Sequence, residues 1–129
     1  PGALELLEQL SANQIPWAIV TSCQTPLANA RIAAAGLPTP PALVSSNDVV
    51  RGKPAPDPYL LGAERLGVDP SRSAVVEDAP AGVRSGLAAG AQVFALETTH
   101  AAADLADAHA VFADLPALTR FLFAGRLPS

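Results

Sequence analysis

The sequence is nearly without cysteine, since Cys23 is the only one among 129 residues. A single cysteine excludes an intramolecular disulfide and a zinc site built from cysteines. It is also typical of a reducing compartment, so we expect a cytoplasmic protein. Long apolar runs are absent too: none approaches the ~20 residues that a membrane-spanning helix needs, and we expect no secretion signal. The sequence therefore predicts no membrane partner.

Positive charge is scarce, with 8 lysines and arginines against 12 aspartates and glutamates, and the net charge at pH 7 is −4. A polyanion such as DNA is therefore not attracted to the chain as a whole, and we expect no nucleic-acid partner. A small phosphate can still bind where a single cation is held in place. Half of the residues are hydrophobic and 16% are charged, which is typical of one globular domain, here residues 1–129.

Short apolar runs alternate with helical patterns along the chain. Predicted strands cover residues 17–20, 42–45, 74–76, 92–96 and 110–112. Predicted helices cover residues 3–13, 26–35, 58–66, 102–108 and 116–124, and a further helix begins between residues 79 and 82 and ends near Gly90. This alternation predicts an α/β fold with a parallel sheet, and strands that are apolar throughout predict helices on both faces. Ligands of such sheets bind beyond the carboxyl ends of the strands.

Thr21 and Ser22 directly follow the predicted strand 17–20. Their hydroxyls can donate to a phosphate oxygen, and the turn leaves backbone N–H groups that can do the same. The alternative is an ordinary turn at a strand end, where threonine and serine are common. The pair by itself leaves both interpretations open.

Lys53 lies between Gly52 and Pro54, in a loop that contains three prolines. The glycine allows close approach and the prolines stiffen the loop, so the ammonium can be held at one point. There it would neutralise phosphate charge. The alternative is a solvated surface lysine, which is the usual environment of this residue.

Glu77 and Asp78 directly follow the apolar run 74–76 and form the strongest single signal. Adjacent carboxylates repel each other unless a cation lies between them, and hard oxygen ligands suit Mg²⁺. The alternative is that Asp78 caps the helix around Pro80, but a cap leaves Glu77 unexplained. The pattern therefore favours a magnesium site at these two residues.

The remaining residues carry weaker signals. Cys23 is interpreted as a small loop residue, because neither His100 nor His109 is placed to act as a base for its thiol. Both histidines are expected at the surface. Trp17 is expected in the core, and Asp57 is expected to cap the helix that follows it.

Together the three motifs resemble the C-terminal part of the haloacid dehalogenase superfamily, the aspartate-nucleophile phosphatases. The segments that carry the resemblance are residues 20–22, 51–57 and 75–82, and they occur in the family's order. The resemblance covers almost the whole chain and is greatest to phosphatases of sugar phosphates and glycerol phosphate. It implies a Mg²⁺-dependent phosphatase that acts on a small phosphorylated metabolite, such as a sugar or polyol phosphate.

The resemblance also implies a role for each motif residue. Thr21 would bind the phosphoryl oxygens through its hydroxyl, and Ser22 through its backbone N–H. Lys53 would be catalytic together with Thr21, by pairing with both the phosphate and the nucleophile. Asp78 would be the direct Mg²⁺ ligand, and Glu77 would hold the metal's waters or orient neighbouring groups.

The family's nucleophile is not among these residues. The family forms an aspartyl-phosphate on an Asp-x-Asp motif, which occurs nowhere in the sequence, and in relatives that strand and the helical cap precede the segment that begins at Pro1. The resemblance therefore implies a partial Rossmann-like parallel sheet, flanked by helices, that lacks the nucleophile strand and the cap. We expect exposed strand edges and an inactive chain in isolation. It also suggests a cis bond between Lys53 and Pro54.

Two alternatives remain open. One is a phosphomutase of the β-phosphoglucomutase type, which shares these core motifs and passes the phosphoryl group to a sugar rather than to water. The other is a non-catalytic fragment that pairs with another chain through its exposed sheet edge.

Overall fold

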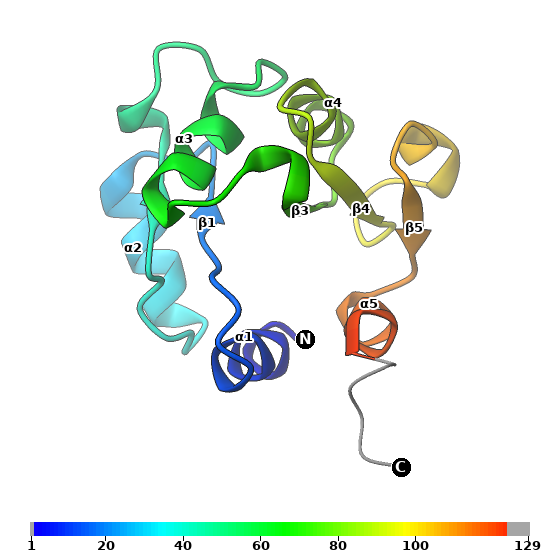
Figure 1. Cartoon of the computed structure of the whole chain (residues 1–129), viewed down its shortest axis with the longest axis horizontal. Helices are drawn as coiled ribbons and strands as arrows, with labels where there is room; N and C mark the ends of the chain where they lie inside the picture. Colours follow the sequence, from blue (N-terminus) through cyan, green and yellow to red (C-terminus); the bar gives the residue numbers. More distant parts are fainter. Residues whose placement is uncertain (1, 124–129) are drawn as a thin grey trace.

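The computed structural model describes residues 2–123, in which strands and helices alternate (Figure 1). The α-helices are α1 (Ala3–Ala12), α2 (Thr25–Ala34), α3 (Asp57–Leu66), α4 (Pro80–Ala88) and α5 (Leu115–Phe123). The strands are β1 (Ile19–Val20), β2 (Leu43–Val44), β3 (Ala74–Glu77), β4 (Gln92–Leu96) and β5 (Ala110–Phe112). Between them lie the short 3₁₀ helices η1 (Ser46–Asp48), η2 (Pro70–Arg72) and η3 (Ala102–Leu105).

The strands form two parallel sheets rather than one. β1 pairs with β2, and β4 lies between β3 and β5 in the second sheet. Ile19 lies opposite Leu43 in the first sheet, and Glu77 lies opposite Ala95 in the second. Within residues 2–123, β1 and β3 each keep one edge without a strand partner.

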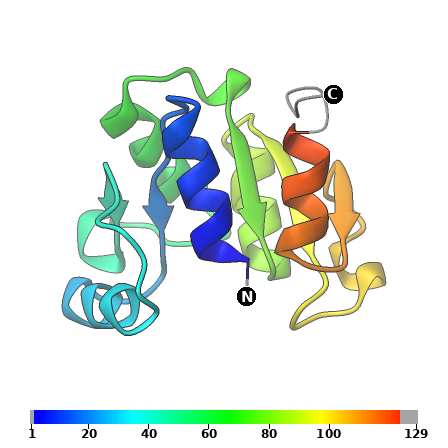
Figure 2. The same ribbon diagram turned by 90° about the horizontal axis from the view of Figure 1, so that it is seen from below.

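Helices cover both faces of the sheets. α1 and α5 lie side by side on one face, and α3 and α4 lie on the other (Figures 1 and 2). α2 lies at the outer end of the molecule, beside the sheet of β1 and β2 (Figure 1). This arrangement confirms the predicted α/β class, with parallel strands flanked by helices.

The packed core lies mainly in the half that contains β3, β4 and β5. One cluster joins β3, α4, β4 and η3 around Val83, Val93 and Leu105, which are 2%, 0% and 0% exposed. A second cluster joins β4 to α5 through Phe94 and Leu118. These contacts fix the position of β3, whose carboxyl end carries the acidic pair.

Several sequence predictions are confirmed at the level of single elements. The strand expected at residues 92–96 is β4, with the same bounds. Trp17 is buried, with 8% of its surface exposed. The bond between Lys53 and Pro54 is cis.

Two local predictions were wrong. The helix expected at residues 102–108 is only the 3₁₀ helix η3, because Leu105 is its single buried residue and gives too short an apolar face to hold a longer helix. Asp57 does not cap α3 but is its first residue, after the N-cap Pro56. Its carboxylate instead pairs with Arg51, with Nη2 and Oδ1 3.1 Å apart.

β3 also differs from the prediction of strands covered on both faces. Its residues alternate between exposed and buried: Val76 is 37% exposed, whereas Val75 is 6% exposed. Val76 faces the space between the two sheets. The last predicted helix, 116–124, corresponds to α5, and Ala124 lies outside the described residues. None of the described helices has the length and apolar character that crossing a bilayer requires.

Candidate functional site

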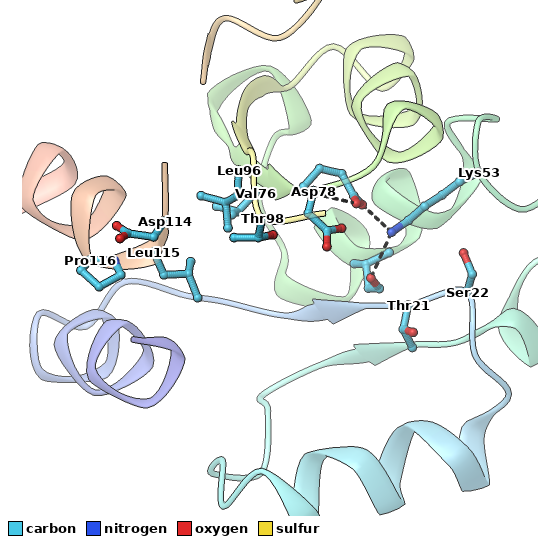
Figure 3. Close-up of a pocket in the computed structure, with 12 residues that line it drawn as sticks. Thr21, Ser22, Lys53, Val76, Asp78, Leu96, Thr98, Asp114, Leu115 and Pro116 are labelled. Carbon is cyan, nitrogen blue, oxygen red and sulfur yellow. Dashed lines mark hydrogen bonds and ion pairs between the residues drawn. The ribbon is translucent and has the colours of Figure 1, made fainter. Parts of the chain in front are cut away.

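A cleft of about 750 Å³ separates the two sheets at the carboxyl ends of β1 and β3. One end of the cleft is lined by the residues of the three sequence motifs: Thr21, Ser22, Lys53, Glu77 and Asp78 (Figure 3). The start of α5 forms the other end (Figure 3). Three motifs that are far apart along the chain therefore meet at one place.

The topology of the chain explains why these residues meet. Thr21 follows the last residue of β1, Glu77 is the last residue of β3, and Asp78 comes next. Because parallel strands of an α/β protein end at the same rim, these side chains reach the same region. Lys53 lies in the loop between η1 and α3 and extends into the cleft (Figure 3).

The hydroxyl of Thr21 orders the turn after β1. Its Oγ1 accepts a hydrogen bond from the backbone N–H of Cys23 at 3.1 Å, and Thr21 N donates to the carbonyl of Val44 at 2.9 Å. The turn interpretation is therefore correct. It does not exclude a binding role, because Oγ1 is the acceptor in this bond and keeps a proton to donate. Ser22 is exposed and lines the same cleft.

Lys53 is held in place rather than solvated. Its Nζ lies 2.6 Å from Glu77 Oε2 and 3.3 Å from the carbonyl oxygen of Val20, and 13% of its side chain is exposed. The ammonium also lies 5.1 Å from the centroid of the Tyr59 ring. The alternative of a solvated surface lysine is therefore wrong. An ammonium fixed at the end of the cleft is placed to meet an anion there.

Glu77 is buried, and both of its carboxylate oxygens accept hydrogen bonds. Oε2 accepts from Lys53 Nζ and from the hydroxyl of Tyr59, and Oε1 accepts from the backbone N–H of Asp78 at 3.2 Å. With these partners, Glu77 acts as the counter-ion of Lys53. This geometry matches the second of the two roles expected for Glu77, the orientation of neighbouring groups.

Asp78 is half-buried, and its carboxylate faces the cleft (Figure 3). Thr99 Oγ1 donates to the backbone carbonyl of Asp78 at 3.2 Å and lies 3.4 Å from its Oδ2. Nδ1 of His100 lies 3.1 Å from the same carbonyl oxygen. Asp78 does not cap α4, whose N-cap is Ala79 with no side-chain hydrogen bond, so the capping alternative is wrong.

Tyr59 is a site residue that the sequence analysis did not identify. It lies in the first turn of α3 and donates its hydroxyl to Glu77. Burial, and next the charge of Glu77, raises the pKa of Tyr59 above its ordinary value. The available signal was slight: Tyr59 is the only tyrosine, and it lies on the helix that follows the Lys53 loop.

Gly82 is a second residue that the sequence analysis did not connect with the site. The carboxyl group of Glu77 lies against α4 at the point where Gly82 has no side chain. A Cβ at this position would overlap Cδ and Oε2 of Glu77. The glycine therefore makes room for the buried carboxylate.

The charges at this end of the cleft favour a bound cation. Lys53 supplies one positive charge that Glu77 already neutralises, so the carboxylate of Asp78 would repel a phosphate dianion. A divalent cation removes that repulsion, and Mg²⁺ typically takes one or two carboxylates, with water and phosphate oxygens as further ligands. No cluster of three or more metal-binding side chains occurs in residues 2–123. The described residues therefore fit a Mg²⁺ that Asp78 shares with other ligands.

Cys23 and His109 lie outside this arrangement of charges, and His100 contacts only the backbone carbonyl of Asp78. Cys23 Sγ accepts a hydrogen bond from Arg31 Nη1 at 3.2 Å. His100 and His109 are exposed, as predicted, and His109 Nδ1 accepts from the backbone N–H of Val93 at 2.9 Å. These contacts give no reason to treat Cys23 as a nucleophile.

Comparison with known sequences gives a family and a relative. The sequence model for haloacid dehalogenase-like hydrolases matches residues 1–90. Hexitol phosphatase A of Escherichia coli (strain K12) is 58% identical over 96 residues, which cover 74% of this chain and 44% of that protein. The chain spans about half the length of the curated relatives it matches.

Comparison with solved structures gives the same fold. A hydrolase from Pseudomonas syringae superposes with a TM-score of 0.90 at 29% identity, over 96% of this chain and 61% of that one. A candidate beta-phosphoglucomutase from Thermotoga maritima superposes with a TM-score of 0.79 at 28% identity, over 98% of this chain and 60% of that one. The fold is thus shared by a hydrolase and a candidate mutase, and it does not distinguish the two reactions.

Proposed function

The chain belongs to the haloacid dehalogenase-like hydrolases, and from this premise we propose that residues 1–129 are the C-terminal part of the core of a Mg²⁺-dependent phosphatase. The proposed substrate is a small phosphorylated metabolite, and the similarity to hexitol phosphatase A supports a sugar or polyol phosphate. One observation carries the proposal: the ammonium of Lys53 is fixed at the end of a cleft that Thr21, Ser22 and Asp78 also line.

Lys53 and Thr21 are the proposed phosphate-binding and catalytic groups. In phosphoryl transfer, negative charge spreads over the oxygens of the transferred group, and donors already fixed in place stabilise it. Lys53 supplies an ammonium that Glu77 holds in position, and Thr21 supplies a hydroxyl proton. Ser22 would add a backbone N–H from the same turn.

Asp78 is the proposed ligand of Mg²⁺ in this chain, and Glu77 is proposed to act through Lys53. When bound, Mg²⁺ would neutralise charge on the phosphate oxygens. Asp78 offers its carboxylate toward the cleft, and the contact with Thr99 orients it. Both oxygens of Glu77 already accept hydrogen bonds, which favours the assignment of the metal to Asp78.

The nucleophilic aspartate that the family uses is proposed to lie on an extended segment in the cleft. β1 and β3 each have an edge without a strand partner in residues 2–123. The cleft also has apolar lining residues: Val20, Val76, Leu96 and Leu115. A parallel strand there would pair with both edges and cover the apolar wall. An aspartate at its carboxyl end would lie beside Lys53, accept the phosphoryl group from the substrate oxygen, and pass it to water.

The test is phosphate release by the complete protein that contains this chain, with Mg²⁺ and a panel of sugar and polyol phosphates. We expect release that a chelator abolishes. Lys53→Ala should lower kcat by about 10² or more, because Lys53 meets charge that grows in the transition state. The matched control is Arg72→Ala, which removes a cation from the exposed helix η2 and should leave kcat unchanged.

Each outcome of this test has one meaning. A folded protein that releases no phosphate from any member of the panel contradicts the proposal. Conversion of a sugar phosphate into its isomer, without release, identifies a phosphomutase. Activity that requires a second, different chain identifies a non-catalytic fragment that pairs with another chain. We also propose a cytoplasmic location because of the single cysteine, and cell fractionation tests it.

A further inference from the structure

Three side chains from three different segments meet at the inner end of the cleft. Lys53 comes from the loop before α3, Tyr59 from the first turn of α3, and Glu77 from the end of β3. The hydroxyl of Tyr59 donates to Glu77 Oε2, which is the oxygen that Lys53 Nζ contacts at 2.6 Å. The ring of Tyr59 lies under the same ammonium, with 5.1 Å between Nζ and the ring centroid. Tyr59 therefore contacts both members of the ion pair.

These two contacts restrict where the ammonium of Lys53 can lie. A lysine side chain has four flexible torsions and loses much conformational entropy when it is fixed. A tyrosine side chain has fewer torsions and is more rigid. Tyr59 also stands on a helix, next to Pro58, so its backbone is fixed. The tyrosine holds Glu77 from one side, and Glu77 together with the aromatic ring then defines one position for the ammonium.

The hydroxyl of Tyr59 also matters for Glu77 itself. Glu77 is 9% exposed, and a buried carboxylate needs donors for its oxygens. The hydroxyl of Tyr59 is one of these donors. Without it, Glu77 would depend on Lys53 and on the backbone of Asp78 alone.

We propose that Tyr59 is a positioning residue: through Glu77 and through its ring, it sets the place of the Lys53 ammonium that binds the phosphoryl group. This inference rests on the proposed function. It goes beyond that function because it assigns a role to a side chain that is not among the lining residues of the cleft.

The experiment compares two substitutions of Tyr59 in the complete protein. Tyr59→Phe removes the hydroxyl and keeps the ring, and Tyr59→Leu removes both. The matched control is Thr119→Val, which deletes a buried hydroxyl that donates to Leu115 O at 2.8 Å within α5, at the end of the cleft opposite Lys53. Each change is made in the wild-type background and with Lys53→Met. The readouts are the affinity for inorganic phosphate with Mg²⁺, measured by calorimetry, kcat and KM, and the free energy of unfolding in urea.

The positioning role predicts a specific pattern. Tyr59→Phe should weaken phosphate binding and lower kcat by about tenfold, which corresponds to one hydrogen bond to a charged group, and Tyr59→Leu should lower both further. In the Lys53→Met background neither change should have a further effect on phosphate binding, because the ammonium that Tyr59 positions is gone. Thr119→Val should change the free energy of unfolding only. If the Tyr59 substitutions weaken phosphate binding equally with and without Lys53, the inference is overturned. Phosphate binding at the wild-type affinity in Tyr59→Phe would overturn it as well.

The unfolding measurements separate this inference from the proposed function. The cycle of Tyr59→Phe and Lys53→Met should show a coupling in the free energy of unfolding even if the protein hydrolyses none of the substrates tested. If the effects of Tyr59→Phe and Lys53→Met on the free energy of unfolding simply add, the contact between Tyr59 and the Lys53–Glu77 pair is contradicted. If the Tyr59→Phe variant hydrolyses sugar phosphates as well as the wild type does, the proposed function stands and the positioning role of Tyr59 is wrong.

Discussion

Glu77 and Asp78 are neighbours in the sequence, but their carboxylates have different partners. Glu77 turns toward α3 and α4 and meets Lys53 and Tyr59, whereas Asp78 faces the cleft. The side chains of adjacent residues at a strand end point to opposite sides, and here one side is the protein interior. An acidic pair that looks uniform in the sequence thus becomes one structural carboxylate and one that is available to a metal.

The first prediction at the residue scale concerns the room that Gly82 leaves for Glu77. Gly82→Ala would place a methyl group on the carboxyl of Glu77, so Glu77 has to move and Lys53 loses its fixed partner. We expect a loss of about 1–3 kcal/mol in the free energy of unfolding, from overpacking. kcat should fall by about tenfold or more, because small displacements of a positioned group have large effects on rate.

The control for this prediction is another glycine inside a helix. At Gly62 in α3, an added Cβ would meet Val20 Cγ2 at 3.1 Å and Val44 Cγ2 at 3.9 Å, and neither contact is an overlap. Both substitutions raise helix propensity by a similar amount. Gly62→Ala should therefore keep most of the activity, and equal losses at the two positions would show that the clash with Glu77 is not the cause.

The second prediction at this scale concerns alkaline pH. The pKa of Tyr59 is raised in the folded protein above its unfolded value of about 10, by burial and by Glu77. The folded state therefore binds this proton more tightly than the unfolded state. The resulting stability is present below pH 10 and is lost as the pH rises above it. Urea unfolding between pH 8 and pH 11 should show a steeper loss for the wild type than for Tyr59→Phe, and parallel curves would contradict the shift.

Lys53, Thr21 and Asp78 could be predicted from the sequence because each stands in a short local motif. Tyr59 and Gly82 could not, because their roles come from contacts with the side chain of Glu77. Tyr59 is 18 residues away from it in the sequence, and no local pattern encodes that distance. Gly82 is nearer, but only the packed structure shows that a carboxylate occupies the place of its side chain.

At the scale of elements, the Lys53 loop is tied to its neighbours through its backbone as well as through Lys53. Ser85 on α4 is fully buried, and its Oγ donates to the carbonyl of Ala55 at 2.6 Å. Within the loop, the backbone N–H of Ala55 donates to the carbonyl of Gly52 at 3.0 Å. The loop is thus closed on itself and attached to α4.

A prediction at this scale follows from the contact between Ser85 and the loop. Ser85→Ala removes the donor to Ala55 and should cost about 1 kcal/mol in the free energy of unfolding. It should also raise KM for the phosphorylated substrate, since the loop that carries Lys53 loses one of its attachments. Thr119→Val is the control, because it deletes a hydroxyl bonded within one helix and should leave KM unchanged. Unchanged KM in Ser85→Ala would contradict the role of this contact.

The order of the elements could be predicted, but the pairing of the strands could not. Apolar runs and proline or glycine boundaries mark where strands and helices begin and end, and β4 illustrates this. The pairing depends on which strands become neighbours in space, which the local pattern does not contain. β1 and β3 face each other across the cleft without pairing. The residues of β3 alternate between exposed and buried, as expected of a strand beside a cleft.

At the scale of the whole molecule, the cleft divides the protein into two parts. We proposed that a strand fills it, and the exposed side chain of Val76 allows a direct test. Val76 is 37% exposed in the described residues, and Leu60 on α3 is 42% exposed, so the two start from similar environments. Only Val76 lines the cleft.

The prediction compares Val76→Lys with Leu60→Lys in the complete protein. If a packed strand covers Val76, a lysine there is buried, and the free energy of unfolding should fall by about 2 kcal/mol or more. Leu60→Lys stays at the surface of a helix and should change it by less than about 0.5 kcal/mol. Urea unfolding of both variants measures the difference. Equal and small effects would show that nothing packs against Val76.

The uneven distribution of the core has a consequence for motion. Both hydrophobic clusters lie in the half with β3, β4 and β5, whereas β1 and β2 share a ladder of two residues each. Local opening needs less free energy where fewer apolar contacts break, so amide hydrogens of β1 should exchange with solvent sooner than those of β4. Thr21 follows β1, in the half without a hydrophobic cluster, and Asp78 follows β3, in the half that contains both clusters. A phosphate bound by Thr21, together with Mg²⁺ bound by Asp78, would link the halves, and this binding should slow hydrogen exchange in β1 and β2 most of all.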